Sequence, residues 1–181
     1  MTNNPAGLLP IFVFVAAVGL SWPVAVATFV LSLRVRPFGR ALRYVGAGVT
    51  VLATIFAASI GVIAGAEVGG IVLASLAIAA VAFGAVPLAV ARSLLVRNGI
   101  EANRALRLSV GAWPVALLVA FGAFIAPGGV ARYNVTFLSG PALYVAVAAI
   151  AALVLLGPAA LGLLAARLGV GAADGSRRRP E

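Results

Sequence analysis

Few side chains in this sequence could perform catalysis or hold a metal ion. The chain contains four acidic residues, no histidine and no cysteine, and all thirteen of its basic residues are arginine. Without histidine and cysteine it lacks the commonest general base, the thiol nucleophile and the usual ligands of zinc. Without lysine it cannot form a Schiff base with a cofactor. We therefore expect no catalytic, cofactor-binding or metal-ligating residue, and a protein that is not an enzyme.

Glu67 is the strongest single candidate for a functional side chain, because it is the one charged residue in a long uncharged stretch, residues 44–91. A carboxylate inside a membrane often marks a proton or cation pathway. However, Gly65, Gly69 and Gly70 surround Glu67 and are typical of a turn. We predict a turn carboxylate at the outer boundary of the membrane, with a cation or coupling site as the alternative.

Pro23 is a second candidate, because it lies in the middle of an apolar segment. A proline leaves the carbonyl of Gly19, four residues earlier, without its helical N–H donor and bends the helix. With Ser21 and Trp22 beside it, this break could line a substrate cavity. The alternative is an ordinary kink, since prolines are common in membrane helices that have no such role.

The composition places these residues in a membrane. Hydrophobic residues make up 64% of the 181-residue chain, charged residues make up 9%, and the mean hydropathy is +1.18. Soluble proteins average about 45–50% apolar and about 25% charged residues, and a membrane-spanning helix needs about 20 apolar residues. We predict an all-α integral membrane protein with one domain, residues 8–166, between a short N-terminus (1–7) and a flexible basic tail (167–181). Its five transmembrane helices are expected at residues 8–33, 44–66, 70–91, 108–126 and 141–166.

The arginines determine the predicted orientation. Four follow the first span, four follow the third and four follow the fifth, so twelve of the thirteen fall on one side of the membrane. By the positive-inside rule this side is the cytoplasm, which puts the N-terminus outside, the C-terminus inside and the protein in the plasma membrane. The basic loops would attract anionic lipid. Nucleic acid is not an expected partner, because the arginines flank apolar runs and form no single patch. The outer loop would carry an N-glycosylation pattern at Asn134, whose use the sequence does not decide.

Small residues recur at intervals of four along the second span, a spacing that lets helix backbones approach closely. We predict a helix-packing face, used either within the chain or between subunits, with chance as the alternative in an Ala- and Gly-rich sequence. The residues concerned are Ala53, Ala57, Gly61, Gly65 and Gly69.

Both tryptophans of the chain lie in the same tetrapeptide, Trp22-Pro-Val-Ala in the first span and Trp113-Pro-Val-Ala in the fourth. These spans run in opposite directions in the predicted topology. The match could therefore belong to an inverted repeat of spans one and two against spans four and five, an arrangement that many transporters use. Chance is the alternative, because Ala, Val and Pro are frequent here. We also expect Trp113 near the inner membrane boundary, where tryptophan is enriched.

These features favour a non-catalytic structural or assembly component of a membrane, which packs with itself or with another membrane protein through the small-residue face. The alternative is a small transporter or channel component, supported by the proline-broken spans and the inverted repeat. A membrane enzyme that acts on lipid ranks third, because the usual catalytic residues are missing. It would need serines, arginines and Glu101 gathered at the headgroup level, and we expect Glu101 to contact Arg97 or Arg104 instead.

Overall fold

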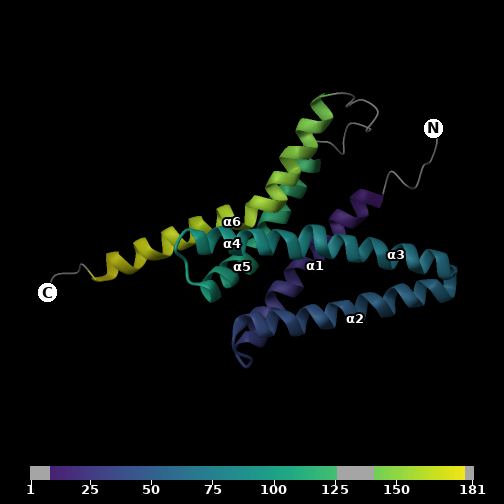
Figure 1. Ribbon diagram of the computed structural model, residues 1–181, viewed down its shortest axis with the longest axis horizontal. Coiled ribbons are helices and arrows are strands. Elements are labelled where there is room, and N and C mark those ends of the chain that lie inside the picture. The colour runs from purple at the N-terminus through teal and green to yellow at the C-terminus, as the bar shows by residue number, and fades with distance from the viewer. Residues whose placement is uncertain (1–8, 126–140, 178–181) are drawn as a thin grey trace.

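The structure, a computed structural model, describes residues 9–125 and 141–177. In these ranges the chain is helical apart from short connections, and five helical rods are long and apolar enough to cross a membrane (Figure 1). The predicted all-helical, multi-pass membrane fold is confirmed, whereas the predicted N-terminus (1–7) and Asn134 lie outside the described residues. The elements are α1 (Leu9–Ser32), α2 (Phe38–Ala64), α3 (Ala66–Ala79), the π-helix η2 (Ala80–Ala85), α4 (Val86–Arg97), α5 (Ala102–Ile125) and α6 (Pro141–Arg177). The third span consists of α3, η2 and α4, which follow one another without a break.

The helices extend further into the arginine-bearing segments than hydropathy predicts. The second span begins at Phe38 and the fourth at Ala102, each six residues before its predicted start, and the third ends at Arg97, six residues after its predicted end. The fifth continues eleven residues beyond its predicted end, to Arg177, so the first part of the predicted tail is helical. Arginine is a good helix former, and its long side chain lets the guanidinium reach water while the backbone remains helical.

A single residue, Gly65, joins α2 to α3. Its φ of +102° lies in the region that favours glycine, and its N–H donates to the carbonyl of Gly61 at 3.0 Å. The predicted turn over residues 65–70 is therefore too long. Glu67 and Gly69 belong to the first turns of α3. The helices α2 and α3 therefore lie side by side from the turn onward.

The five rods form two parts that pack differently. In the bundle, α5 packs against α1, α4 and α6, and α4 also packs against α6. In the hairpin, α2 pairs with α3 and also packs against α1. The hairpin extends away from the C-terminal half of α6 (Figure 1). The start of α2 is anchored to the bundle by Phe38, which is buried in one cluster with Ala25 of α1 and Val110 of α5.

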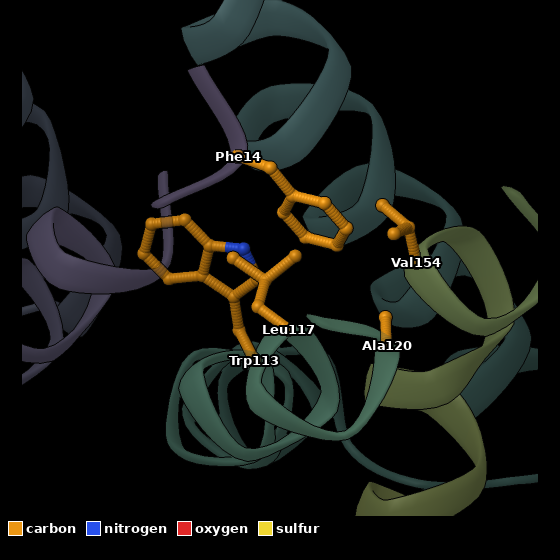
Figure 2. Packing of buried hydrophobic residues seen from close by; sticks show 5 residues of the cluster. All are labelled: Phe14, Trp113, Leu117, Ala120 and Val154. Atoms are coloured by element: carbon orange, nitrogen blue, oxygen red, sulfur yellow. The ribbon is translucent and has the colours of Figure 1, made fainter. Parts of the chain in front are cut away.

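An aromatic cluster fills the centre of the bundle. The ring of Phe14 on α1 stacks on Phe83 of η2, with centroids 5.1 Å apart, and meets Phe121 of α5 edge-on at 5.4 Å. Such aromatic pairs contribute about 0.5–1.5 kcal/mol each beyond the area that they bury. Figure 2 shows how side chains from α1, α5 and α6 converge here, namely Phe14, Trp113, Leu117, Ala120 and Val154.

Trp113 links α5 to the third span through a hydrogen bond from its side chain to the backbone. Its indole Nε1 donates to the carbonyl of Phe83 in the π-helix η2. The Trp113 side chain is only 7% exposed and is part of the bundle core. Its position near the inner membrane boundary remains a prediction.

Candidate functional site

The predicted small-residue face is a helix contact within the chain, between α2 and α3. Gly69 of α3 is buried against α2. A Cβ added to it would lie 2.7 Å from the Cα of Gly61 and 2.8 Å from the carbonyl oxygen of Ala57, distances that real Cβ atoms do not adopt. Ala57 itself is 2% exposed. The backbones of α2 and α3 therefore meet at these three positions, and only glycine fits at position 69.

The rest of the hairpin surface faces outward from the protein. Only 6% of the residues in the most apolar stretch of α2 are buried, and 11% in that of the third span, against 39% in that of α5. Large apolar side chains cover this surface, among them Leu52, Ile55, Phe56, Val62 and Ile63, each more than half exposed. The hairpin thus buries its small residues inside and presents its large ones to lipid or to another protein.

The polar side chains on α2 are compatible with that apolar surface. Thr50 donates to the carbonyl of Gly46 at 3.0 Å, Thr54 to that of Thr50 at 2.9 Å, and Ser59 to that of Ile55 at 2.9 Å. Each hydroxyl is satisfied by its own helix, which is how serine and threonine are accommodated in a membrane. These residues therefore place no unpaired donor on the outer face of the helix.

The two internal carboxylates both lie at helix N-termini, where a negative charge is favourable. Glu67 is exposed in the first turn of α3, at the tip of the hairpin. Glu101 lies directly before α5 and accepts hydrogen bonds from the backbone N–H groups of Asn103 and Arg104, at 2.8 and 2.9 Å. These two bonds, with a smaller contribution from the charge of Arg107, lower the pKa of Glu101. The predicted contact between Glu101 and an arginine side chain is thus replaced by a cap on the α5 backbone.

The surroundings of Pro23 do not form a polar cavity. Ser21 is fully buried, and its hydroxyl donates to the carbonyl of Val18 at 2.7 Å within the same helix. Trp22, by contrast, is 46% exposed on the outer surface of α1. The two residues expected to line a cavity therefore face different environments, and the Ser21 hydroxyl is already engaged by its own helix.

The two Trp-Pro segments also have different surroundings. In α1, Trp22 and Pro23 are exposed, whereas in α5, Trp113 and Pro114 are buried. The tetrapeptide that suggested an inverted repeat therefore packs differently in its two copies. The repeat itself remains a prediction.

The chemistry available to the described residues is limited. Within residues 9–125 and 141–177, no three residues of the His, Cys, Asp or Glu types gather in a group that could hold a metal ion. The buried hydroxyls of Thr28 and Ser109 donate to the carbonyls of Val24 and Ala105, each in its own helix. These hydroxyls serve the backbone and are not paired with a base.

A groove with a volume of about 540 Å³ lies between α1, α5 and α6. Apolar side chains line most of it, with Arg104 and Arg107 of α5 among the lining residues. The sequence analysis missed this groove. The sequence feature that indicates the groove is Gly111, which lies four residues after Arg107 and thus on the same face of the helix. The missing side chain leaves space there.

Comparison with known proteins assigns no family to these features. The chain matches no protein-family model, no curated protein and no solved structure. Its function must therefore be argued from its own residues.

Proposed function

We propose that this protein is a non-catalytic assembly component of the plasma membrane, which docks onto a second copy or onto another membrane protein through the outer faces of the α2–α3 hairpin. The observation that carries the proposal is the contrast in burial: the hairpin spans have 6% and 11% of their most apolar residues buried, and α5 has 39%. A pair of helices held this far out of its own bundle offers both of its outer faces to a neighbour.

The internal contact of the hairpin supports this role. In lipid, helices associate through close packing, because lipid tails are as apolar as the side chains. Contact between Gly69, Gly61 and Ala57 fixes the two backbones against each other. The outer faces are thus carried on a rigid pair, and docking a rigid surface loses less conformational freedom than docking a mobile one.

The proposed orientation has the arginine-bearing ends in the cytoplasm and the tip of the hairpin outside. It is supported by the arginine count of the loops and the positive-inside rule. It is also supported by the packing of two of these ends against each other, since Arg36, after α1, and Arg107, near the start of α5, line one pocket.

Docking through the hairpin is tested by crosslinking single cysteines in native membranes. The chain has no cysteine of its own, so each introduced thiol is unique. Leu52→Cys places a thiol on α2, and Val145→Cys places a control on α6 at the same exposure, 68% in both cases. We expect a bifunctional maleimide to give a specific adduct at residue 52, either of two chains or of the chain with one partner, and none at residue 145. Equal adduct yields at the two positions, or no adduct at residue 52, would contradict the proposal.

The orientation is tested by labelling whole cells with a maleimide that does not cross membranes. Glu67 and Asn98 are both exposed and lie at opposite ends of the third span. Glu67→Cys should react in intact cells, and Asn98→Cys only after lysis. The reverse pattern would invert the proposed topology without affecting the docking proposal.

A further inference from the structure

The groove between α1, α5 and α6 is built along one face of α5. Arg104, Arg107, Gly111, Ala112 and Val115 all line it, and their spacing of three and four residues places them on one side of a helix. From the first to the last of these residues α5 rises about 16 Å. Along α5 the groove therefore has its cationic side chains at one end and small residues in its middle.

Side chains from the other two helices form the walls of the groove. Phe29 of α1 lies on one side, and Leu161 and Ala165 of α6 lie on the other. Glycine at position 111 leaves space in the groove because it has no side chain. A Cβ there would lie 3.6 Å from the Phe29 ring, which is an ordinary contact, so the groove has room for it. The hollow thus results from the sequence of α5 itself.

The cationic end of the groove is held in place by aromatic contacts. The guanidinium of Arg107 lies over the ring of Phe38, 5.6 Å from its centroid, and Phe38 in turn packs against Phe29 at 5.1 Å. Arg107 also lines an adjoining pocket of about 390 Å³, together with Arg36. Arg107 is thus shared by the groove, which Arg104 also lines, and by the pocket that Arg36 lines. The carboxylate of Glu101 is already engaged by two backbone N–H groups.

We propose that this groove binds one anionic phospholipid from the leaflet on the arginine side of the membrane. The phosphate would contact Arg104 and Arg107, since guanidinium groups bind phosphate oxygens in a fixed, bidentate geometry. One acyl chain would lie over Gly111 and Ala112, between Phe29 and Leu161. This inference is independent of the docking proposal, because the groove belongs to the bundle and not to the hairpin.

The length and the lining of the groove favour an anionic phospholipid as its ligand. The groove length of about 16 Å corresponds to one leaflet, because the hydrocarbon core of a bilayer is about 30 Å thick. The charge at one end and the apolar lining elsewhere match a molecule with an anionic head and a hydrocarbon tail. A free phosphate ion would leave the apolar part empty, and a zwitterionic lipid would bring its own cation close to the arginines.

The headgroup contact is tested by native mass spectrometry of the full chain in detergent, titrated with dioleoyl phosphatidylglycerol or with dioleoyl phosphatidylcholine. The wild type should bind the first phosphatidylglycerol more tightly than phosphatidylcholine. Arg104→Gln/Arg107→Gln should lower the phosphatidylglycerol affinity by roughly 30-fold, because each basic side chain near an anionic headgroup contributes roughly fivefold and the variant removes two. The matched control is Arg40→Gln/Arg43→Gln, which removes the same charge at the start of α2, outside the groove. Equal losses in the two double variants would show attraction by net charge alone and would overturn the site.

The acyl-chain contact is tested with Gly111→Leu, whose side chain would fill the groove. It should lower the affinity for phosphatidylglycerol by about tenfold or more, because the leucine side chain would occupy the place of the acyl chain and remove its close packing against the groove. Gly111→Ala fits beside Phe29 and should fold normally while causing a smaller loss. Gly122→Leu is the matched control on the same helix, because a side chain there meets no atom within 4 Å. Unchanged binding in Gly111→Leu would overturn the groove as the lipid site, whatever the arginine variants show.

Discussion

In the α2–α3 hairpin the helices meet at their backbones, whereas in the bundle they meet through large side chains. At its closest point the hairpin contact is formed by Ala57, Gly61 and Gly69, none of which has a side chain larger than a methyl group. The bundle contact consists of aromatic rings around Phe14 and of the hydrogen bond from Trp113 to the third span. Neither contact gains from excluding water inside a membrane, so each depends on fit. Close packing in the hairpin results from the absence of large side chains, whereas close packing in the bundle results from the shapes of its large side chains.

The largest effect on stability is expected at Gly69, where the hairpin leaves no space for a side chain. Gly69→Leu would force a side chain against the α2 backbone, which cannot move aside as a flexible side chain could, and should destabilise the protein by about 3 kcal/mol. Gly70→Leu is the matched control, because a Cβ at Gly70 meets nothing within 4 Å. Thermal unfolding in detergent measures both. Equal melting temperatures for the two variants would show that α2 and α3 do not meet at Gly69.

The bundle should respond to the loss of one hydrogen bond. Trp113→Phe keeps an aromatic ring but removes the indole N–H that donates to the Phe83 carbonyl. An unpaired carbonyl in an apolar interior costs about 1–3 kcal/mol, so we expect a loss of about 2 kcal/mol. Trp22→Phe is the control in the matching tetrapeptide, where the side chain is half exposed, and it should change stability by less than about 0.5 kcal/mol. A similar loss in both variants would mean that the two tryptophans have similar surroundings, as an inverted repeat would require.

The smallest effect on stability is expected at the N-termini of α5 in the bundle and α3 in the hairpin. Glu101 caps α5 of the bundle with two hydrogen bonds, while no side chain caps the start of α3 in the hairpin. Because these bonds lower the pKa of Glu101 in the folded protein, its contribution to stability is fully present above the usual glutamate pKa. It is lost as the pH falls through the lower folded-state value.

Glu101→Gln should therefore lower the melting temperature at neutral pH and flatten its decrease on acidification. The change should be smaller than that of Trp113→Phe, because Glu101 is exposed to solvent. Glu67→Gln in the hairpin serves as the control, because no side chain caps the start of α3, and it should lower the melting temperature at neutral pH by less than Glu101→Gln does. An unaltered acid profile in Glu101→Gln would show that the cap does not contribute to stability.

Hydropathy was sufficient to predict five helices, because twenty or more apolar residues in a row have few other folds available. It could not predict where helices end, since Arg104 and Arg107 are good helix formers outside the apolar segment. It also could not distinguish a residue facing lipid from one facing another helix, because both environments are apolar. For this reason neither the burial of Trp113 in the bundle core nor the groove at Gly111 was predicted. The intervals of four in α2 did identify a real contact, although Gly69 belongs to the opposite helix.

The connection at Gly65 has a consequence for how the chain can change over generations. Each residue of a helix advances it by about 100° around its axis. Inserting one residue at this point would rotate α3 by that angle and bring Val68 to the place that Gly69 occupies. The number of residues in this connection is thus as constrained as the type of residue at position 69. Elsewhere along the chain, a longer loop could absorb the same insertion.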